Sequence, residues 1–448
     1  MTGSDNNSAR PIGILAGNGS LPVEIARAIA ARGGRVAIVA INSDVDPDLA
    51  RFDLTHAGLG QIGRILAAFR AADCRELVIV GGVSRPDLAR LTPDFGIIAN
   101  LPDVLRVLTS GGDDGVLRAV VRFFEAKGFT VVSPADVAPD LVVGAGALTA
   151  VAPTLAQTQD ILLGSRVVKA LGVYDVGQAV IVSGGELIAI EAAEGTDAML
   201  QRVASLRQHD GHAGAPRGVL VKRPKPGQEM RVDLPAIGPA TVTRSAAAGL
   251  AGVAVLAGQT LAAQRGDLLA RARLAGLFIY GFTEGDALRP PVAGPWNNAQ
   301  PRATGARRLG KTQLSDARLG AAALGALGEL ARNGAAVVHR GHVLALNPGG
   351  DVDGLIQRAA RLKQWGEGRR LRGLGVLVLG EGMKPDLDII AAAGAARLAG
   401  VASMGQELAG YEVGGQGFAD TITRAARAAG VFLVQLTPAE PTPLKRPT

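Results

Sequence analysis

Cysteine and aromatic residues are scarce in this chain of 448 residues. The single cysteine, Cys74, excludes an internal disulfide framework and a zinc site built on cysteines. Only 3% of the residues are aromatic, so the core has to be built from Val, Leu, Ile and Ala, and stacking platforms for single-stranded nucleic acid are not expected. No basic run is long enough to serve as a nucleic-acid arm, so no nucleic-acid partner is predicted.

Long hydrophobic runs are missing as well. The two longest uncharged windows, 141–159 and 245–264, are rich in Ala and interrupted by Gly, Thr, Gln or Pro, which is typical of buried elements rather than membrane spans. The first residues lack the basic-then-apolar pattern of a signal peptide, so the chain is expected in the cytoplasm. The 48% of hydrophobic residues indicates a globular protein, and the net charge of +7 suits anionic ligands.

Residues 10–145 alternate short apolar strands with helical stretches. Ile12–Ala16, Val36–Ile41 and Leu77–Val80 are nearly continuous apolar runs, and helical stretches separate them. This alternation predicts an α/β domain with a parallel sheet covered on both faces.

Further along, the chain is predicted to hold a second α/β domain at 154–282, a Pro-rich linker at 283–310, an internal repeat at 311–437 and a disordered tail at 438–448. The repeat is visible in matching stretches: Gly218–Val221 recurs as Gly375–Val378, and Leu250–Ala254 recurs as Leu398–Ala402. The charged loop Lys222–Gly238 has no full counterpart in the second copy. The scaffold was repeated and its most polar loop was not.

That loop is the strongest chemical signal in the sequence. Lys222, Lys225 and two arginines surround Asp233, within a frame of prolines and glycines. Cations neutralise a diphosphate, while a carboxylate binds Mg²⁺ or takes a proton from water. The structural alternative is a polar crossover loop without a ligand.

Two glycine-rich turns follow predicted strands of the first domain. The turn Gly17–Pro22 can present backbone N–H groups and a helix N-terminus to a phosphate, or it is only a strand-to-helix turn. It is not a dinucleotide fingerprint, because Pro22 replaces the third glycine and the next strand ends in Asn42 rather than an acid. The turn Gly81–Pro86 places Arg85 where ligands bind in open α/β sheets, although a solvated arginine is the equal alternative.

A third candidate lies between a predicted strand and helix of the second domain. Glu194 and Asp197 can share a divalent cation, or Thr196 or Asp197 can cap the helix. Asp353 retains the position of Asp197 in the repeat, whereas Glu194 has no counterpart there. This difference favours a cap at Asp197 and a functional role for Glu194.

Six motifs in fixed order resemble one family: GILAGNGSLP, GGVSRP, GDDG, DVGQAVIV, EAAEGTDAML and VKRPKPGQEMRVDLPAIGP. They are similar to the metal-dependent UDP-2,3-diacylglucosamine pyrophosphatases of lipid A synthesis, which some bacteria use in place of a calcineurin-like enzyme. The resemblance covers about residues 10–282, and the remaining segment is interpreted as a degenerate duplicate of the family's C-terminal domain.

The resemblance implies a Rossmann-like N-terminal domain, an α/β catalytic domain, and an active site between them. It implies that water attacks the β-phosphorus of UDP-2,3-diacylglucosamine with Mg²⁺ as cofactor, giving UMP and 2,3-diacylglucosamine 1-phosphate (lipid X). The resemblance also implies that Asp233 is essential, and it is the expected catalytic residue. The remaining roles are predicted from the chemistry of the residues: Asp233, Glu194 and Asp197 are the expected metal ligands. Candidate substrate-binding residues are Gly17, Asn18, Gly19, Ser20, Arg85, Gln178, Thr196, Lys222 and Lys225.

Two departures from the family pattern lead to further expectations. Leu256 stands where an acid is expected after the strand at 252–255, and the third segment has Leu379 in place of Lys222. The third segment is therefore predicted to be catalytically silent and to serve as a built-in partner, giving an intrachain pseudo-dimer or an ordinary homodimer. Peripheral contact with the cytoplasmic face of the inner membrane is expected because the substrate is a lipid.

Two other function classes compete with hydrolysis. A non-catalytic nucleotide-sugar or lipid-binding regulator would explain Leu256 and the extra segment, although the complete 222–238 loop favours the enzyme. A nicotinamide oxidoreductase ranks third because the dinucleotide fingerprint is broken.

Overall fold

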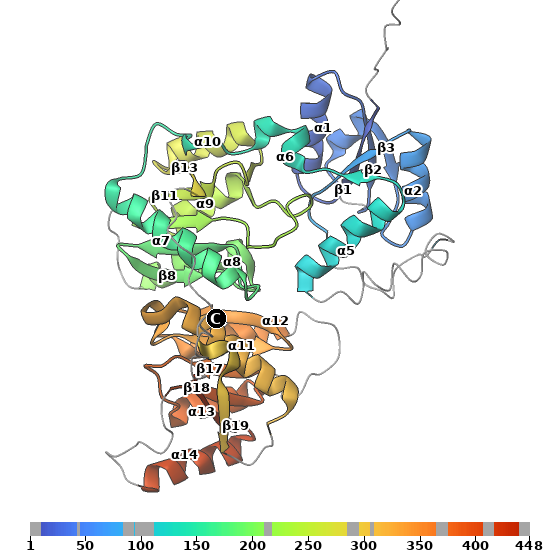
Figure 1. Cartoon of the computed structure of the whole chain (residues 1–448). Helices are drawn as coiled ribbons and strands as arrows, with labels where there is room; N and C mark the ends of the chain where they lie inside the picture. Colours follow the sequence, from blue (N-terminus) through green and yellow to red (C-terminus); the bar gives the residue numbers. More distant parts are fainter. Residues whose placement is uncertain are drawn as a thin grey trace, which may run out of the picture. The chain divides into compact units, whose positions relative to one another are not determined.

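The computed structural model describes residues 10–42, 45–83, 94, 112–209, 217–284, 295–304, 309–363, 375–405 and 416–438. Arg85 and the predicted tail from 439 onward lie outside these residues. Figure 1 shows the elements along the chain and labels many of them.

A five-stranded parallel sheet forms from the first part of the chain. Its strands are β1 (Ile12–Ala16), β2 (Val36–Ala40), β3 (Asp53–His56), β4 (Glu76–Val80) and β5 (Thr130–Val131). Their order is β3-β2-β1-β4-β5, and all pairs are parallel. After β1, the chain adds β2 and β3 on one side of β1 and then adds β4 and β5 on its other side. The strand order therefore reverses between β1 and β4. The α/β class with a parallel N-terminal sheet, predicted from the alternation of strands and helices, is confirmed.

Both faces of this sheet are covered, because alternate residues of each strand point to opposite sides. Ile14 packs in one core cluster with residues of α1 (Leu21–Ala31). Leu15, next along β1, packs in the other cluster with residues of α2 (Ile62–Ala71) and α5 (Gly112–Ala126). This two-sided burial explains why the strands read as continuous apolar runs.

Two six-stranded sheets follow, and they share one strand order. The first has the order β6-β13-β11-β9-β7-β8 and the second β14-β19-β18-β17-β15-β16. The first consists of β6 (Gly146–Ala147), β7 (Ala179–Ser183), β8 (Glu186–Ile190), β9 (Val219–Lys222), β11 (Gly252–Leu256) and β13 (Phe278–Phe282). The second consists of β14 (Gln300–Thr304), β15 (Ala335–His339), β16 (His342–Asn347), β17 (Val376–Leu379), β18 (Gly400–Met404) and β19 (Phe432–Thr437).

The helices between these strands also correspond in order. They are α7 (Leu155–Gly172), α8 (Gly195–His209), α9 (Pro239–Ala247) and α10 (Arg265–Leu274), then α11 (Lys311–Leu327), α12 (Val352–Lys363), α13 (Leu387–Ala395) and α14 (Gln416–Ala429). Short elements complete the described chain: η1 (Pro47–Arg51), α6 (Pro134–Val137), η3 (Pro139–Leu141), β10 (Ala236–Ile237), β12 (Leu261–Ala262), η5 (Pro295–Asn298) and η6 (Gly328–Ala331).

A buried aspartate holds the hairpin turn in each of the two similar sheets. Asp160 of α7 accepts hydrogen bonds from the backbone N–H groups of Gly184 (2.9 Å) and Gly185 (2.7 Å). Asp316 of α11 accepts the same pair of bonds from Arg340 (2.9 Å) and Gly341 (2.7 Å). Because each carboxylate satisfies two turn N–H groups, it fixes the hairpin against the helix that precedes it.

Part of the stretch predicted as a linker, 283–310, has regular structure. Its strand β14 pairs along its whole length with β19 at the edge of the second six-stranded sheet. Trp296 in η5 is 5% exposed and packs where a Cβ on Gly325 of α11 would collide with it. Proline is tolerated at a sheet edge, so Pro301 is compatible with an edge strand inside this proline-rich stretch.

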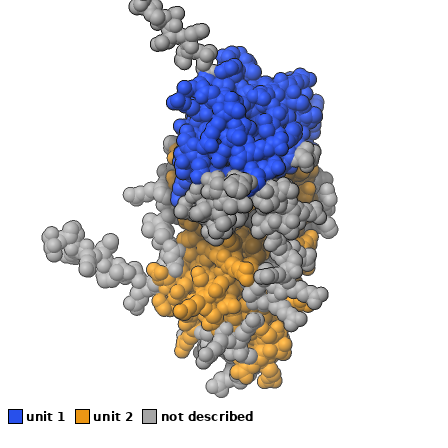
Figure 2. Space-filling model, turned by 90° about the vertical axis from the view of Figure 1, so that its right-hand side faces the viewer, with its two compact units in different colours: residues 1–150, 227–243, 255–281 blue, residues 151–226, 244–254, 282–448 orange. Residues whose placement is uncertain are grey.

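The chain divides into two compact units, coloured in Figure 2. Unit 1 holds 1–150, 227–243 and 255–281, and unit 2 holds 151–226, 244–254 and 282–448. The boundaries of these units differ from those of the three predicted segments, because parts of the predicted second domain fall in each unit. Among the described residues, no helix is both long and apolar enough to cross a bilayer.

Candidate functional site

The loops that follow β1 and β4 lie against each other in unit 1. Asn18 and Gly82 exchange two backbone hydrogen bonds of 2.8 Å, and Gly17 N–H donates to the Val80 carbonyl at 2.8 Å. A Cβ on Gly17 would lie 2.5 Å from the Gly82 carbonyl oxygen, so only glycine allows this approach. The contact lies at the carboxyl ends of the strands where the strand order reverses, the position at which open α/β sheets bind ligands.

Asn18 is oriented within this contact. Its Oδ1 accepts a hydrogen bond from Asn42 Nδ2 at 2.8 Å, and the same amide donates to the Gly82 carbonyl at 3.3 Å. Asn42 therefore has a structural role where a dinucleotide site would have an acid. The structure brings the predicted Gly17–Ser20 loop beside the start of the Gly81 turn, while Arg85 lies outside the described residues.

Three sequence motifs meet at one end of the first six-stranded sheet, in unit 2. In the register, Ala179 of β7 faces Lys222 of β9, and Val180 faces Ile190 of β8. Gln178 and Glu191, the next residues along their strands, therefore join Lys222 at the same end. Gln178 N–H donates to a carboxylate oxygen of Glu191 at 3.2 Å, which fixes the two motifs together.

Lys222 and Glu191 form a buried pair of opposite charges at this end. Lys222 is 8% exposed and Glu191 is 6% exposed. Lys222 Nζ donates to Thr196 Oγ1 at 3.3 Å. Burial raises the pKa of Glu191 above its ordinary value, and the charge of Lys222 together with hydrogen bonds from Gln178 and Thr196 partly opposes that rise. A raised carboxyl pKa beside a lysine marks a site able to hold or move a proton.

The other cations of the 222–238 loop also have acidic partners. Lys225 Nζ lies 2.5 Å from Asp175 Oδ1, and Arg223 lies 2.5 Å from Glu284. Arg231 pairs with Glu229 at 2.8 Å, and a further partner is Glu125 of α5. The cations that the sequence analysis assigned to a diphosphate are thus held in place by carboxylates before any ligand arrives.

Asp233 has a fixed backbone within unit 1. Its N–H donates to the Glu229 carbonyl at 2.9 Å, and its carbonyl accepts from Gln228 Nε2 at 2.7 Å. Val232 beside it packs against the core cluster of the parallel sheet. The half-buried Asp233 side chain is therefore carried on a rigid turn rather than on a loose loop.

The two acids proposed as further metal ligands each have an arginine partner. Glu194 Oε1 accepts from Arg202 Nη2 at 2.9 Å, and Asp197 lies 3.2 Å from Arg244. In the part of the chain that the structure describes, no group of three or more His, Cys, Asp or Glu side chains could hold a metal ion. Mg²⁺ commonly binds through one or two carboxylates plus substrate phosphates, so a single carboxylate such as Asp233 fits its chemistry.

Glu191 is the residue that the sequence reasoning overlooked. It occurs in the EAAEGTDAML motif, in which the spacing of Glu194 and Asp197 around a glycine makes those two acids the more evident candidates. The usable signal was an acid directly after the apolar strand Leu187–Ile190, where burial is expected. Leu256, noted as a departure from the family pattern, ends β11 and is 1% exposed.

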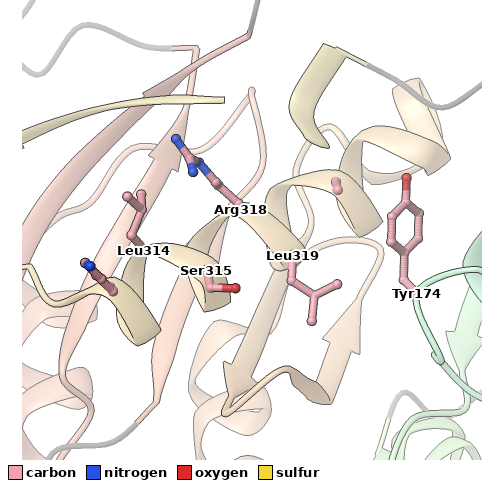
Figure 3. A pocket seen from close by; sticks show the side chains of 7 residues that line it. Tyr174, Leu314, Ser315, Arg318 and Leu319 are labelled. Atoms are coloured by element: carbon pink, nitrogen blue, oxygen red, sulfur yellow. The ribbon is translucent and has the colours of Figure 1, made fainter. Parts of the chain in front are cut away.

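A separate cavity of about 490 Å³ lies in unit 2, along α11 (Figure 3). Tyr174 comes from the segment after α7, and the other lining residues are Lys311, Leu314, Ser315, Arg318, Leu319 and Ala322. Arg318 is partly engaged, since its Nε donates to the Ala299 carbonyl at 2.8 Å. None of the predicted site residues lines this cavity.

Comparisons with known proteins identify the family. Residues 11–141 match the LpxI N-terminal domain and residues 144–280 match the LpxI C-terminal domain. UDP-2,3-diacylglucosamine pyrophosphatase LpxI of Caulobacter vibrioides is 41% identical over 273 residues, which are 61% of this chain and 97% of that protein. A murein peptide ligase from Psychrobacter arcticus aligns over 96% of this chain and 91% of its own at 12% identity, but its TM-score of 0.19 carries no argument.

These matches correct the family assignment made from the sequence. That assignment included the third segment as a degenerate duplicate of the family's C-terminal domain, whereas the matched family domains end at residue 280. The shared strand order of the two six-stranded sheets is a structural likeness and does not extend the family match. Because 97% of the LpxI relative is covered at 41% identity, this chain belongs to the LpxI family.

Proposed function

We propose that this chain hydrolyses UDP-2,3-diacylglucosamine to UMP and 2,3-diacylglucosamine 1-phosphate, as a step of lipid A biosynthesis. The observation that carries the proposal is the 41% identity to a pyrophosphatase of that name over nearly its whole length. The candidate residues support it with chemistry that suits a diphosphate: a carboxylate on a fixed backbone turn, preorganised cations, and glycine-rich loops at the carboxyl ends of parallel strands.

Asp233 is the catalytic residue in this proposal. Two hydrogen bonds hold its backbone in place, so its carboxylate is carried on a fixed turn from which it can orient a water molecule or hold Mg²⁺. Mg²⁺, when bound, neutralises charge on the diphosphate oxygens. Glu194 and Asp197 are weaker candidates for metal ligands, because arginines already neutralise them.

Each unit, taken by itself, holds candidate substrate-binding residues. In unit 1, the N–H groups of Gly17 and Asn18 already donate to Val80 and Gly82, so the Gly17–Ser20 loop offers the N–H groups of Gly19 and Ser20 to a phosphate or nucleotide. In unit 2, Lys225 is proposed to bind an anionic group of the substrate in place of its ion pair with Asp175. The Asp175 side chain is 41% exposed, so it can move into solvent. Lys222 is too deeply buried to bind a phosphate from solvent, so its charge acts on Glu191 and Thr196 at the end of the sheet.

Two partner assignments remain proposals of the same kind. Contact with the cytoplasmic face of the inner membrane follows from a diacylated substrate. An intrachain pseudo-dimer is favoured over a homodimer, because α7 contacts α11 and the edge strand β8 contacts β16 within unit 2. Matching elements that meet in this way reproduce the geometry of a two-fold interface.

The experiment that tests the function is turnover of UDP-2,3-diacylglucosamine with Mg²⁺ in ¹⁸O-labelled water. We expect label in the phosphate of the lipid product, and a loss of at least about a hundredfold in kcat for Asp233→Asn. Asp267→Asn is the matched control, since Asp267 is half exposed and pairs with Arg271 on the surface of α10. Label in UMP would overturn attack at the β-phosphorus.

A second candidate, the non-catalytic lipid or nucleotide-sugar regulator, is separated by the same experiment. Substrate-dependent stabilisation of the fold without turnover in the wild-type chain would favour it. The buried Leu256 favours the regulator, because the family pattern expected from the sequence has an acid at this position.

A further inference from the structure

The contact between the two similar sheets brings together two equivalent arginines. Strands β8 and β16 meet at their sheet edges, and each leads directly into a helix, α8 or α12. Arg202 of α8 and Arg358 of α12 occupy the same position of these helices, 156 residues apart and each preceded by Gln. Equivalent positions approach each other near the axis of a two-fold contact, and here the two guanidinium groups interact electrostatically.

Only one carboxylate of the 191–197 turn accompanies these arginines. Glu194 Oε1 accepts a hydrogen bond from Arg202, and the Glu194 side chain is only 10% exposed. The position equivalent to Glu194 in the third segment is Gly350, so the partner acid is missing. Asp351 also acts on Arg358, but it is exposed.

Several complementary polar atoms in this cluster are buried and lack partners. Within the described residues, Glu194 Oε2 accepts no hydrogen bond, and Arg358 Nε and Nη2 donate none. Burial and the charge of Arg202 lower the pKa of Arg358 to about 10, while Glu194 raises it, so Arg358 and Glu194 interact favourably. Leaving a buried acceptor such as Glu194 Oε2 and buried donors such as those of Arg358 unpaired costs free energy, so a hydrogen bond between them would stabilise the fold.

The turn that carries Glu194 also carries residues of the candidate site. Glu191 lies three residues before Glu194 and faces Lys222, and Thr196 lies two residues after it and accepts from Lys222 Nζ. Any group that fixes both oxygens of Glu194 therefore restricts the backbone between Glu191 and Thr196.

We propose that Arg358 is a positioning residue for the 191–197 turn: Arg202 holds one oxygen of Glu194, and Arg358 of the third segment binds the other when its unpaired Nε and Nη2 turn toward it. The third segment thereby supplies from the same chain a cation that orders the Glu191–Thr196–Lys222 end of the first six-stranded sheet. The role in turnover rests on the proposed hydrolase function, whereas the role in ordering the turn does not.

The first test compares Arg358→Gln with Arg361→Gln in the full-length protein. Arg361 lies on the same helix and is exposed, so it controls for the loss of one positive charge. We expect Arg358→Gln to lower kcat/KM about tenfold, mainly through KM because the turn carries the substrate-binding candidate Thr196, while Arg361→Gln stays within about twofold. Arg358→Lys should recover part of the loss. Equal kinetics of the two Gln variants would overturn the role in turnover.

The second test needs no substrate and therefore survives a failure of the hydrolase proposal. Amide hydrogen exchange of residues 192–197 should accelerate about tenfold in Arg358→Gln and stay unchanged in Arg361→Gln. Adding Glu194→Gln should make the Arg358 substitution silent, because the remaining acceptor oxygen can pair with Arg202 and the negative charge that attracts Arg358 is gone. Unchanged exchange in Arg358→Gln, or full additivity with Glu194→Gln, would show a merely structural cluster and refute the proposal.

Discussion

Gly17→Ala tests whether the two loops at the point of strand-order reversal require their close contact. A Cβ on Gly17 would lie 2.5 Å from the Gly82 carbonyl oxygen and 2.8 Å from the Gly81 carbonyl carbon. Both are backbone atoms, so the collision cannot be relieved by rotating a side chain. The loops have to separate, which weakens the two Asn18–Gly82 hydrogen bonds.

The expected loss of stability follows from these contacts. Overpacking costs about 1–3 kcal/mol, and two weakened backbone hydrogen bonds add about 1 kcal/mol, giving roughly 2–4 kcal/mol for unit 1. Gly58→Ala is the matched control, because Gly58 lies in the same unit and a Cβ there meets nothing within 4 Å.

Two measurements follow the separation of the loops. Amide exchange at Gly17, Asn18 and Gly82 reports the local contact, and urea unfolding followed by a probe in unit 1 reports the stability. If Gly17→Ala unfolds at the same urea concentration as Gly58→Ala and keeps slow exchange at Asn18, the close approach does not stabilise the fold and the argument from the missing Cβ fails.

Two further predictions concern buried acids. Asp160→Asn and Asp316→Asn should each cost about 1–3 kcal/mol in urea unfolding, because each replaces an acceptor of two turn N–H groups by an amide that repels one of them; wild-type midpoints would contradict the hairpin role. Burial raises the pKa of Glu191 in the folded chain above its ordinary value of 4.5. The contribution of Glu191 to the free energy of unfolding is therefore fully present below pH 4.5 and is lost as pH rises through the pKa of the folded state. Glu191→Gln should therefore flatten the fall of stability above pH 4.5 in urea titrations, and an unaltered pH slope would exclude Glu191 as its source.

Strands and helices could be predicted where burial is two-sided or periodic. The apolar runs that became β1, β2 and β4 need no knowledge of their neighbours, because covering both faces makes the whole strand hydrophobic. By contrast, the sequence predicts a linker where β14 forms, because the pairing of β14 with β19 depends on residues more than a hundred positions away. Proline content describes local freedom and says nothing about such a partner.

The candidate site was predicted in its residue types and less well in its contacts. The sequence shows that cations gather between Lys222 and Arg231, and this pattern predicts that they bind a diphosphate ligand. The structure gives each of them an acidic partner from a distant stretch, such as Asp175 for Lys225 and Glu284 for Arg223. The charged residues of a motif can be read from the sequence, whereas the residues that neutralise them are known only once the chain has folded.

The third segment indicates why the charges at the end of the first six-stranded sheet are retained. The positions equivalent to Gln178, Glu191, Thr196 and Lys222 are Gly334, Asn347, Val352 and Leu379, so the same strand order is built without this buried pair of opposite charges. Leu379 is fully buried at the end of β17.

A buried ion pair is often no more stabilising than apolar residues of similar volume, because desolvation offsets its attraction. The architecture therefore does not require Lys222 or Glu191 for folding. Since the second sheet shows that Leu can end the equivalent strand, the cost of burying Lys222 beside Glu191 is best explained by a chemical role at that end of the first sheet, which is the end that Arg358 is proposed to order.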